Sequence, residues 1–170
     1  MMRLIGLVKG WPGKPSHPPL TDASIGAYTV GVAMLVLGAL GVQEGPMAHG
    51  SLLAIGGGLA LALPTALTGL LDWLDIPKGT PPRTIATVHL LTMLTATLLF
   101  AVAFIGQLDG YDHRRIDTLG LAFGLAAEAL LAAGGYIGGT LVFVYGNRVL
   151  KQPETPVRDA LVPGRADPGS

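Results

Sequence analysis

Four long apolar runs, separated by short polar connections, constrain the fold of this chain more than any other feature of its sequence. The runs cover approximately residues 23–42, 51–74, 84–106 and 118–145. A helix that crosses the hydrocarbon core of a bilayer needs about 20 mostly apolar residues, and each run is long enough. Only 13% of the residues are charged, about half the share that a water-soluble domain normally carries. The sequence therefore predicts an all-α integral membrane protein with four spanning helices.

The short connections predict how these helices pack. Sequential helices joined by short loops pack antiparallel as neighbours, so we expect a four-helix antiparallel bundle over residues 17–149. The run Leu4 to Val8 is too short for the apolar core of a signal peptide. Residues 1–16 are therefore expected to lie at the membrane surface, with Trp11 at the level of the lipid headgroups. The polar, proline-rich residues 150–170 are expected to form an extended tail.

The distribution of positive charge predicts the orientation of the bundle. An even number of spans puts both termini and the second connection on one side. Arg114 and Arg115 are the positive residues of the other side. By the positive-inside rule, the chain is a multi-pass protein of the cell membrane with both termini in the cytoplasm. The cytoplasmic side then carries nine positive residues: Arg3, Lys9, Lys14, Lys78, Arg83, Arg148, Lys151, Arg158 and Arg165.

Composition excludes several classes of function. The formal net charge is zero, so no basic field attracts nucleic acid. The chain has no cysteine, which excludes disulfides, thiolate metal sites and a cysteine nucleophile. Neither Ser16 nor Ser24 has a convincing base beside it. The sequence therefore indicates no membrane hydrolase, and it favours a non-enzymatic role without deciding the question.

Glycines dominate one face of the fourth run. Gly134 and Gly138, and likewise Gly135 and Gly139, form two overlapping pairs of small residues four apart. Such pairs let the backbones of membrane helices approach closely, so we expect a helix-packing face here. The alternative is that the missing side chains leave room for a flat cofactor or a lipid tail.

Four ionisable residues are expected to meet at the cytoplasmic end of the bundle. They are His17, Asp22, Asp72 and His89. Ionisable side chains inside membrane segments are candidate functional residues, and this topology brings these four to one level. The sequence therefore predicts a cofactor-binding pocket with His17 and Asp22 at its rim and Asp72 and His89 at its inner wall.

Each of these residues also has a structural interpretation. Asp22 can cap the first helix, and His17 can be solvated in a rigid loop before it. Asp72 can pair with Arg83 or with His89. His89 can bond to a neighbouring carbonyl or threonine.

Other ionisable residues lie outside this group. Glu128 lies nearer the external side of the fourth run, where it can pair with a threonine of the third. The external connections contain His49 and His113 beside several acidic residues. Two interpretations of these residues are open: a surface metal site, or ordinary solvated residues of a loop. The two halves of the chain show no convincing internal repeat.

Several strings, taken together, resemble one bacterial membrane family. The chain is similar over about residues 14–149 to domain-of-unknown-function family two-two-three-one. Members of the family typically open with a doubled His-Pro pattern, of which this chain has only the half at His17-Pro18. Some similar members are fused to Rieske-type iron–sulfur domains, so the resemblance implies redox company, that is, association with redox proteins. The strings are "KPSHPPL" (14–20), "ALPTALTGLLDW" (62–73), a histidine at 89 early in the third run, and "GGYIGGTLVFVYGNRV" (134–149).

Three functions follow from these observations. The first is an accessory subunit that packs in a larger membrane complex in redox company, with the lipid bilayer and other membrane subunits as partners. The alternative is an electron-transfer subunit that binds haem b or quinone, with His17 and His89 as ligands of the haem iron and Asp22 or Asp72 orienting a histidine. The second alternative is a small transporter or proton pathway through Glu128, Asp72 and His89.

Overall fold

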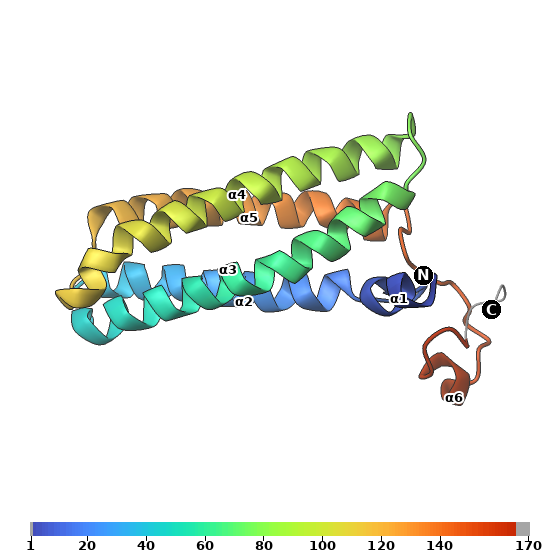
Figure 1. Cartoon of the computed structure of the whole chain (residues 1–170), viewed down its shortest axis with the longest axis horizontal. Coiled ribbons are helices and arrows are strands. Elements are labelled where there is room, and N and C mark those ends of the chain that lie inside the picture. Colours follow the sequence, from blue (N-terminus) through green and yellow to red (C-terminus); the bar gives the residue numbers. More distant parts are fainter. Residues whose placement is uncertain (1, 166–170) are drawn as a thin grey trace.

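The fold is a bundle of four long helices, with smaller elements at one end (Figure 1). The computed structural model describes residues 2–165. The elements in chain order are α1 (Met2–Lys9), β1 (Gly10–Trp11), β2 (Lys14–Pro15), α2 (His17–Ala39), α3 (Glu44–Asp75), α4 (Pro81–Asp112), α5 (Thr118–Phe143) and α6 (Val157–Ala160).

The four long helices are those that the apolar runs predict. Helices α2, α3, α4 and α5 are each long and apolar enough to cross a membrane. Three of them extend beyond the predicted bounds: α2 begins at residue 17 instead of 23, α3 at 44 instead of 51, and α4 ends at 112 instead of 106. Two ends fall short of the prediction, since α2 ends at 39 instead of 42 and α5 at 143 instead of 145. The helical backbone continues into polar residues that a hydropathy pattern assigns to loops. The connections between the spans are accordingly shorter than expected.

Prolines explain the early starts of two helices. Pro18 and Pro19 occupy the first turn of α2, and Pro81 begins α4. Proline suits this position, because its fixed φ is helical and the first turn requires no backbone N–H from it. The His-Pro-Pro segment is therefore helical, and the prediction of a loop around His17 is wrong.

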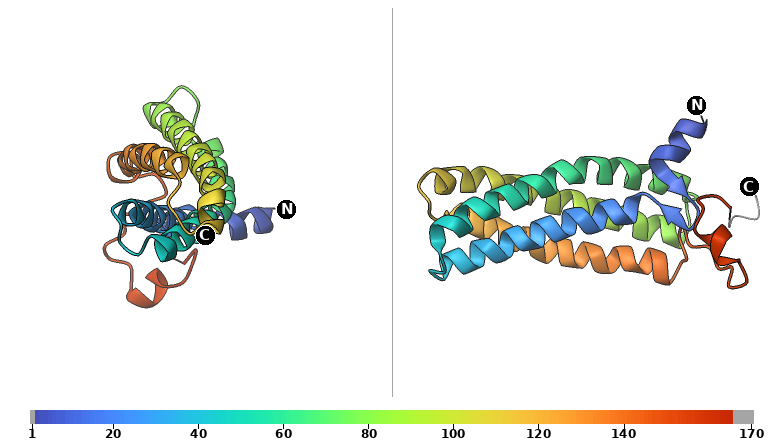
Figure 2. Two further views of the ribbon diagram at one scale, coloured as in Figure 1. Left: turned by 90° about the vertical axis from the view of Figure 1, so that its left-hand side faces the viewer. Right: turned by 90° about the horizontal axis from the view of Figure 1, so that it is seen from below.

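The bundle consists of two helical hairpins. Helix α2 packs most closely against α3, and α4 against α5, while contacts between the two hairpins are fewer. Both hairpins are antiparallel, so the described ends of the chain and the α3–α4 loop lie at one end of the bundle (Figure 1). In the right-hand view of Figure 2, α2 and α5 diverge toward that end. We call this the open end, and the other the closed end.

The hydrophobic core joins the hairpins away from the open end. Its members come from all four helices and touch along one continuous cluster. Tyr28 and Phe100 stack face to face in it, with ring centroids 3.9 Å apart and planes inclined by 2°. The buried members of the cluster are Tyr28, Val32, Leu35, Ile55, Phe100, Ala127 and Leu131.

A buried glutamine fixes the closed end. The Gln107 side chain has no exposed surface. Its Nε2 donates to Arg115 O at 2.9 Å, and its Oε1 accepts from Asp117 N at 2.9 Å. Asp117 in turn caps α5, since its side chain accepts from Leu119 N at 2.8 Å. The amide thereby satisfies the backbone of the α4–α5 connection, which apolar neighbours could not do.

The chain ends pack against the open end. Strands β1 and β2 pair antiparallel between α1 and α2. The segment after α5 runs back beside them, and Gly13 N donates to Arg148 O at 3.0 Å. Farther along the predicted tail, the short helix α6 lies beyond the open end of the bundle (Figure 1). The predicted interfacial segment, residues 1–16, thus falls mostly on α1, β1 and β2. Residues 166–170 of the tail lie outside the described residues.

Candidate functional site

A cavity of about 930 Å³ lies between the four spanning helices toward the open end. The hydrophobic core forms its inner end, where Tyr28 and Leu131 line it. Most of its wall is apolar, which is usual for sites that bind small molecules or cofactors. The exposed residues Asp22 of α2 and Gly135 of α5 belong to its wall. Helices α2 and α5 diverge toward the open end (Figure 2).

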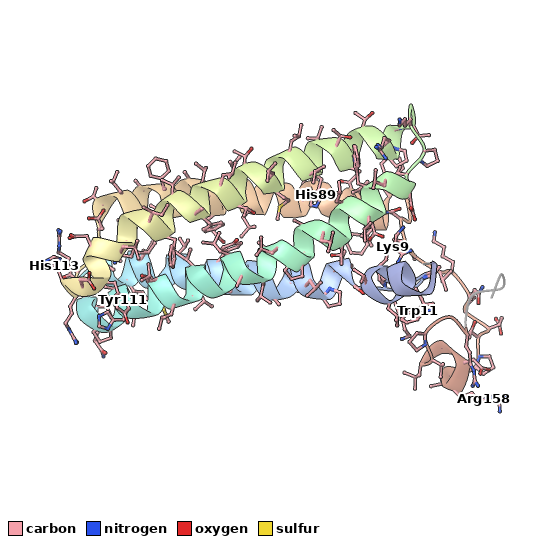
Figure 3. All side chains as sticks on the ribbon, in the orientation of Figure 1. Lys9, Trp11, His89, Tyr111, His113 and Arg158 are labelled. Atoms are coloured by element: carbon pink, nitrogen blue, oxygen red, sulfur yellow. The ribbon has the colours of Figure 1, made fainter. Side chains whose placement is uncertain are left out.

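All four of the predicted pocket residues line this cavity. They are His17, Asp22, Asp72 and His89. His17 is within electrostatic range of both Asp72 and His89. Figure 3 shows His89 on α4, closer to the middle of the bundle than the labelled Lys9. The fold therefore brings these residues to one site from three different helices.

The two histidines make equivalent contacts in the two hairpins. The Nδ1 atom of His17 lies 3.0 Å from Thr65 O of α3, and the Nδ1 atom of His89 lies 2.8 Å from Gly134 O of α5. In both hairpins a glycine follows that carbonyl after one helical turn and contacts the ring. A Cβ built on Gly69 would lie 2.7 Å from His17 Cε1, and one on Gly138 would lie 2.8 Å from His89 Cε1.

This equivalence is an internal repeat that the sequence alone does not reveal. In each hairpin, a histidine near the start of the first helix bonds to a carbonyl of the second and lies against a glycine four residues later. Each half of the repeat consists of a backbone carbonyl and of a glycine, which has no side chain. Few residue identities are needed to maintain it, so the sequence shows no recognisable repeat.

The carbonyl contacts fix the tautomer of both rings. A carbonyl oxygen only accepts hydrogen bonds, so Nδ1 carries the proton in His17 and in His89. In the neutral ring, Nε2 then keeps its lone pair. Among the described residues, neither Nε2 has a hydrogen-bond partner. A histidine with Nδ1–H held by a carbonyl and Nε2 open is the usual form of an imidazole ligand.

The glycine pairs of α5 divide between packing and cavity. Gly138 packs on His89, and Gly134 on another side chain of α4. A Cβ on Gly135 would have no neighbour within 4 Å, and one on Gly139 would meet only a side chain of its own helix. Gly135 and Gly139 line the cavity, as Gly138 does beside His89. One face of α5 therefore packs closely, and the adjacent face leaves a flat wall.

This difference predicts contrasting effects for two neighbouring glycines. We expect Gly138→Ala to destabilise the protein by about 1–3 kcal/mol, because the new methyl group overlaps a histidine ring that its hydrogen bond holds in place. The control is Gly135→Ala, which adds the same group to open space and should leave stability unchanged or slightly raised. Thermal unfolding in detergent measures both. Equal stability of the two variants would contradict the described contact.

Asp72 forms the centre of a charged cluster at the outer end of the cavity. Its Oδ1 lies 3.3 Å from Arg148 Nε and 3.9 Å from Lys9 Nζ. Lys9 also pairs with Asp75. The Asp72 and Lys9 side chains are each 10% exposed, and that of Arg148 is 17% exposed. The expected partners of Asp72, which were Arg83 and His89, are thus replaced by residues of α1 and of the segment after α5.

Burial and neighbouring charges also change the pKa of the Lys9 ammonium group in this cluster. Burial lowers the pKa of Lys9, the Asp72 carboxylate opposes that shift, and the Arg148 guanidinium lowers the pKa further. Arg148 additionally donates through Nη2 to Lys9 O at 3.0 Å and to Gly10 O at 2.8 Å. The cluster therefore ties α1 and β1 to the end of α3 and to the chain after α5.

Arg83 has a different role from the one predicted. Its guanidinium carbon lies 3.4 Å from the centroid of the Trp73 ring. Its Nη1 donates to Ile76 O at 3.0 Å and also to Trp73 O. The Trp73 Nε1 in turn donates to Thr87 Oγ1 at 3.0 Å. Arg83 therefore fastens the α3–α4 loop by a cation–π contact and hydrogen bonds.

Asp22 lies within α2, one turn after the helix begins, so the expectation that it caps this helix is wrong. The N-cap residue is Ser16, and its side chain makes no cap bond. Asp22 is exposed on the wall of the cavity.

Three other ionisable residues, Glu128, His49 and His113, do not line the cavity. Thr29 Oγ1 of α2 donates to Glu128 Oε1 at 2.8 Å, so the threonine partner comes from the first span and not from the third. Glu128 does not line the cavity that Asp72 and His89 share. At the closed end, His49 bonds to Tyr111 O at 2.9 Å, and Figure 3 shows Tyr111 and His113 there. Within residues 2–165 no three histidine or acidic residues are grouped as metal ligands.

Sequence reasoning missed two residues of the site. Arg148 and Lys9 are the partners of Asp72, and they lie outside every apolar run. The available signal was the charge count, which puts both residues at the same end as Asp72. The charge count indicates on which side of the membrane these residues lie, but it does not indicate which residues they contact.

Comparison with known proteins identifies the family. No curated protein and no solved structure is significantly similar to the chain. One family, described as "Predicted membrane protein (DUF2231)", matches residues 13–151. These residues include the four spanning helices, both histidines and Arg148. The chain therefore belongs to this family of predicted membrane proteins, whose common domain has no known function.

Proposed function

We propose that this protein is a membrane electron-transfer subunit that binds one haem b through His17 and His89. The observation that carries the proposal is the pair of equivalent half-sites. Each hairpin presents one imidazole to the same cavity, with Nδ1–H held by a carbonyl and with Nε2 open. Neutral imidazole nitrogens are common ligands of haem iron, so His17 and His89 would hold the group.

The shape of the cavity supports a planar group. Its volume is about 930 Å³, near the upper end of the usual range for cofactor sites. Gly135 and Gly139 give α5 a wall without side chains, against which a flat macrocycle fits. A bare metal ion is a poorer candidate, because it needs more protein ligands than two histidines.

The distribution of charge supports one orientation of the group. Among the described residues, Arg148 is the positive side chain that lines the cavity, and it lies beside Asp72, as Lys9 does. The inner end is apolar. A haem carries two carboxylates on one edge and apolar substituents on the other, so its carboxylates would face Arg148. When bound, haem supplies a one-electron redox centre, while this chain holds it, orients it and excludes water from it.

A haem titration tests this function. Detergent-purified protein is mixed with increasing haem, and the visible spectrum is recorded. We expect saturation at one haem per chain and a low-spin, six-coordinate spectrum. A spectral change that does not saturate, or one that persists in the His17→Ala, His89→Ala double variant, would overturn the proposal.

An accessory role in a larger complex is a second, compatible proposal. Tyr136 and Phe143 of α5 are 83% and 88% exposed on the outside of the bundle. They lie seven residues apart and therefore share one helix face. The Tyr136 hydroxyl would find a hydrogen-bond partner more readily on another membrane subunit than in lipid hydrocarbon. Co-purification that is lost in a Tyr136→Leu, Phe143→Leu variant would support this role.

The cytoplasmic orientation of the open end is also a proposal, and it predicts a labelling pattern. The chain has no cysteine, so single cysteines can be introduced as probes. With a membrane-impermeant maleimide, we expect His113→Cys to react in intact cells and Lys78→Cys to react only after permeabilisation. The reverse pattern would invert the orientation. Reaction of both residues from one side would show that α4, which lies between them, does not cross the membrane.

A further inference from the structure

Two segments of the chain close the cavity at the open end. Residues 10–15 contain the hairpin of β1 and β2, and residues 146–150 follow α5. We call these two segments the lid. Most of the other cavity wall consists of spanning helices, so the lid lies between the cavity and the aqueous side. The lid residues that line the cavity are Gly13, Pro15, Asn147, Arg148, Val149 and Leu150.

The lid is attached by polar contacts and not by the hydrophobic core. Gly13 N donates to Arg148 O at 3.0 Å, which joins the two segments. Arg148 Nη2 donates to Lys9 O and to Gly10 O, and Arg148 Nε lies 3.3 Å from Asp72 Oδ1. The two hydrophobic clusters of the described residues take no member from either segment. A region with few buried apolar contacts opens at a lower free-energy cost than the core.

Arg148 is the centre of these contacts, and its backbone is strained. Its φ is 62°, in the left-handed region, which is unfavourable for a residue with a side chain. Strain of this kind persists only where the surrounding contacts impose it. Gly146, two residues earlier, has a φ of 64°, and a Cβ on it would meet nothing within 4 Å. The bonds of Arg148 therefore hold a strained closed state, and the glycine before it is a suitable hinge.

We propose that the lid opens to admit water-soluble and charged groups to the cavity, and that Arg148 is its latch. In the closed state the guanidinium joins the backbone of Lys9 and Gly10 to Asp72 of α3. Release of these bonds frees both segments together, because Gly13 bonds to the backbone of the same arginine.

The lid also gives the proposed haem an entry route. A group with carboxylates crosses lipid at a high cost, so it enters the cavity more readily from the aqueous end. This route rests on the proposed function, whereas the lid itself does not.

A cysteine inside the cavity reports opening of the lid. Ser24 lines the cavity, is 4% exposed and differs from cysteine by one atom. The chain has no cysteine, so Ser24→Cys carries a single thiol. The haem-free full-length protein is placed in lipid nanodiscs, and its reactions with a cationic and with an anionic methanethiosulfonate are followed by mass spectrometry. Charged reagents do not pass through lipid, so their rates report access from the aqueous end.

Loss of the latch should speed both reactions. In Arg148→Gln we expect each rate to rise about tenfold, as for the loss of a hydrogen bond to a charged group. Removal of one positive charge without opening would instead slow the anionic reagent and speed the cationic one. The control thiol is Lys78→Cys in place of Ser24→Cys. It lies exposed in the α3–α4 loop, and its rates should change less than twofold.

A disulfide across the lid tests the opposite change. A Cβ built on Gly13 lies 3.5 Å from Leu150 Cβ, which is within the range of disulfides. In the oxidised Gly13→Cys, Leu150→Cys protein, we expect the Ser24→Cys thiol to become unreactive toward both reagents. The matched control is Gly13→Ser, Leu150→Ser, which places side chains of similar size at the same positions without a bridge.

Three results would overturn the proposal. The first is a Ser24→Cys thiol that reacts with neither reagent in the unlocked protein. The second is a thiol that reacts at the same rate in the locked and unlocked proteins. The third is a pair of rates that change in opposite directions in Arg148→Gln. Should Arg148→Gln not fold, the locked protein decides. No haem is present, so this test and the haem titration can fail separately.

Discussion

Replacement of His89 by alanine is expected to lower haem affinity by at least about 100-fold and to leave any residual haem high-spin. The removal of a group that merely orients a metal ligand typically costs 10–100-fold in affinity, and His89 is proposed to be the ligand itself. Haem titration and the visible spectrum of the purified variant measure both effects. His17→Ala is expected to act in the same way, because its contacts in the other hairpin are equivalent.

His49 provides a matched control for this prediction. It also bonds to a backbone carbonyl of a neighbouring helix, Tyr111 O of α4 at 2.9 Å, but it lies at the closed end. His49→Ala should lose a comparable structural bond and keep its haem affinity. If His49→Ala and His89→Ala weaken haem binding equally, the effect of His89 is structural and the assignment of a ligand role fails.

Replacement of Asp72 by asparagine is expected to destabilise the protein by about 3 kcal/mol. The side chain is 10% exposed and is the shared partner of Arg148 and Lys9, both of which are also largely buried. Lys9 keeps its pair with Asp75, but Arg148 loses its carboxylate partner, and an uncompensated buried charge typically costs about 3–5 kcal/mol. Thermal unfolding in detergent, followed by tryptophan fluorescence, measures the change.

Asp75 is the control for this second prediction. It also pairs with Lys9, but its side chain is 64% exposed. Exposed ion pairs contribute about 0–1 kcal/mol, so Asp75→Asn should have little effect. A loss of stability in Asp75→Asn as large as in Asp72→Asn would show that burial of the cluster does not determine its importance.

The spanning helices follow from the sequence, whereas their bounds do not. Lipid requires long apolar segments, so hydropathy identifies α2, α3, α4 and α5 reliably. The same pattern cannot detect helical residues that leave the hydrocarbon region. The sequence pattern therefore assigns His17 to a loop and Asp22 to a helix cap, although both lie inside α2.

The location of the candidate site also follows from the sequence, but its contacts do not. The topology brings His17, Asp72 and His89 to the same end of the bundle, and all three line one cavity. Their partners are backbone carbonyls, glycines and the charges of the chain ends. Which carbonyl a ring meets depends on how far two helices are displaced along one another. That displacement is set by packing along their whole length, which no short motif encodes.

The most direct test of the account is the spin state of the iron in haem-loaded protein, measured by low-temperature electron paramagnetic resonance. The central claim is that the two hairpins each contribute one imidazole to the same group. The account predicts a low-spin signal with two imidazole ligands in the wild type, and a high-spin signal in both His17→Ala and His89→Ala. A high-spin wild type, or a low-spin signal unchanged in either single variant, would contradict it.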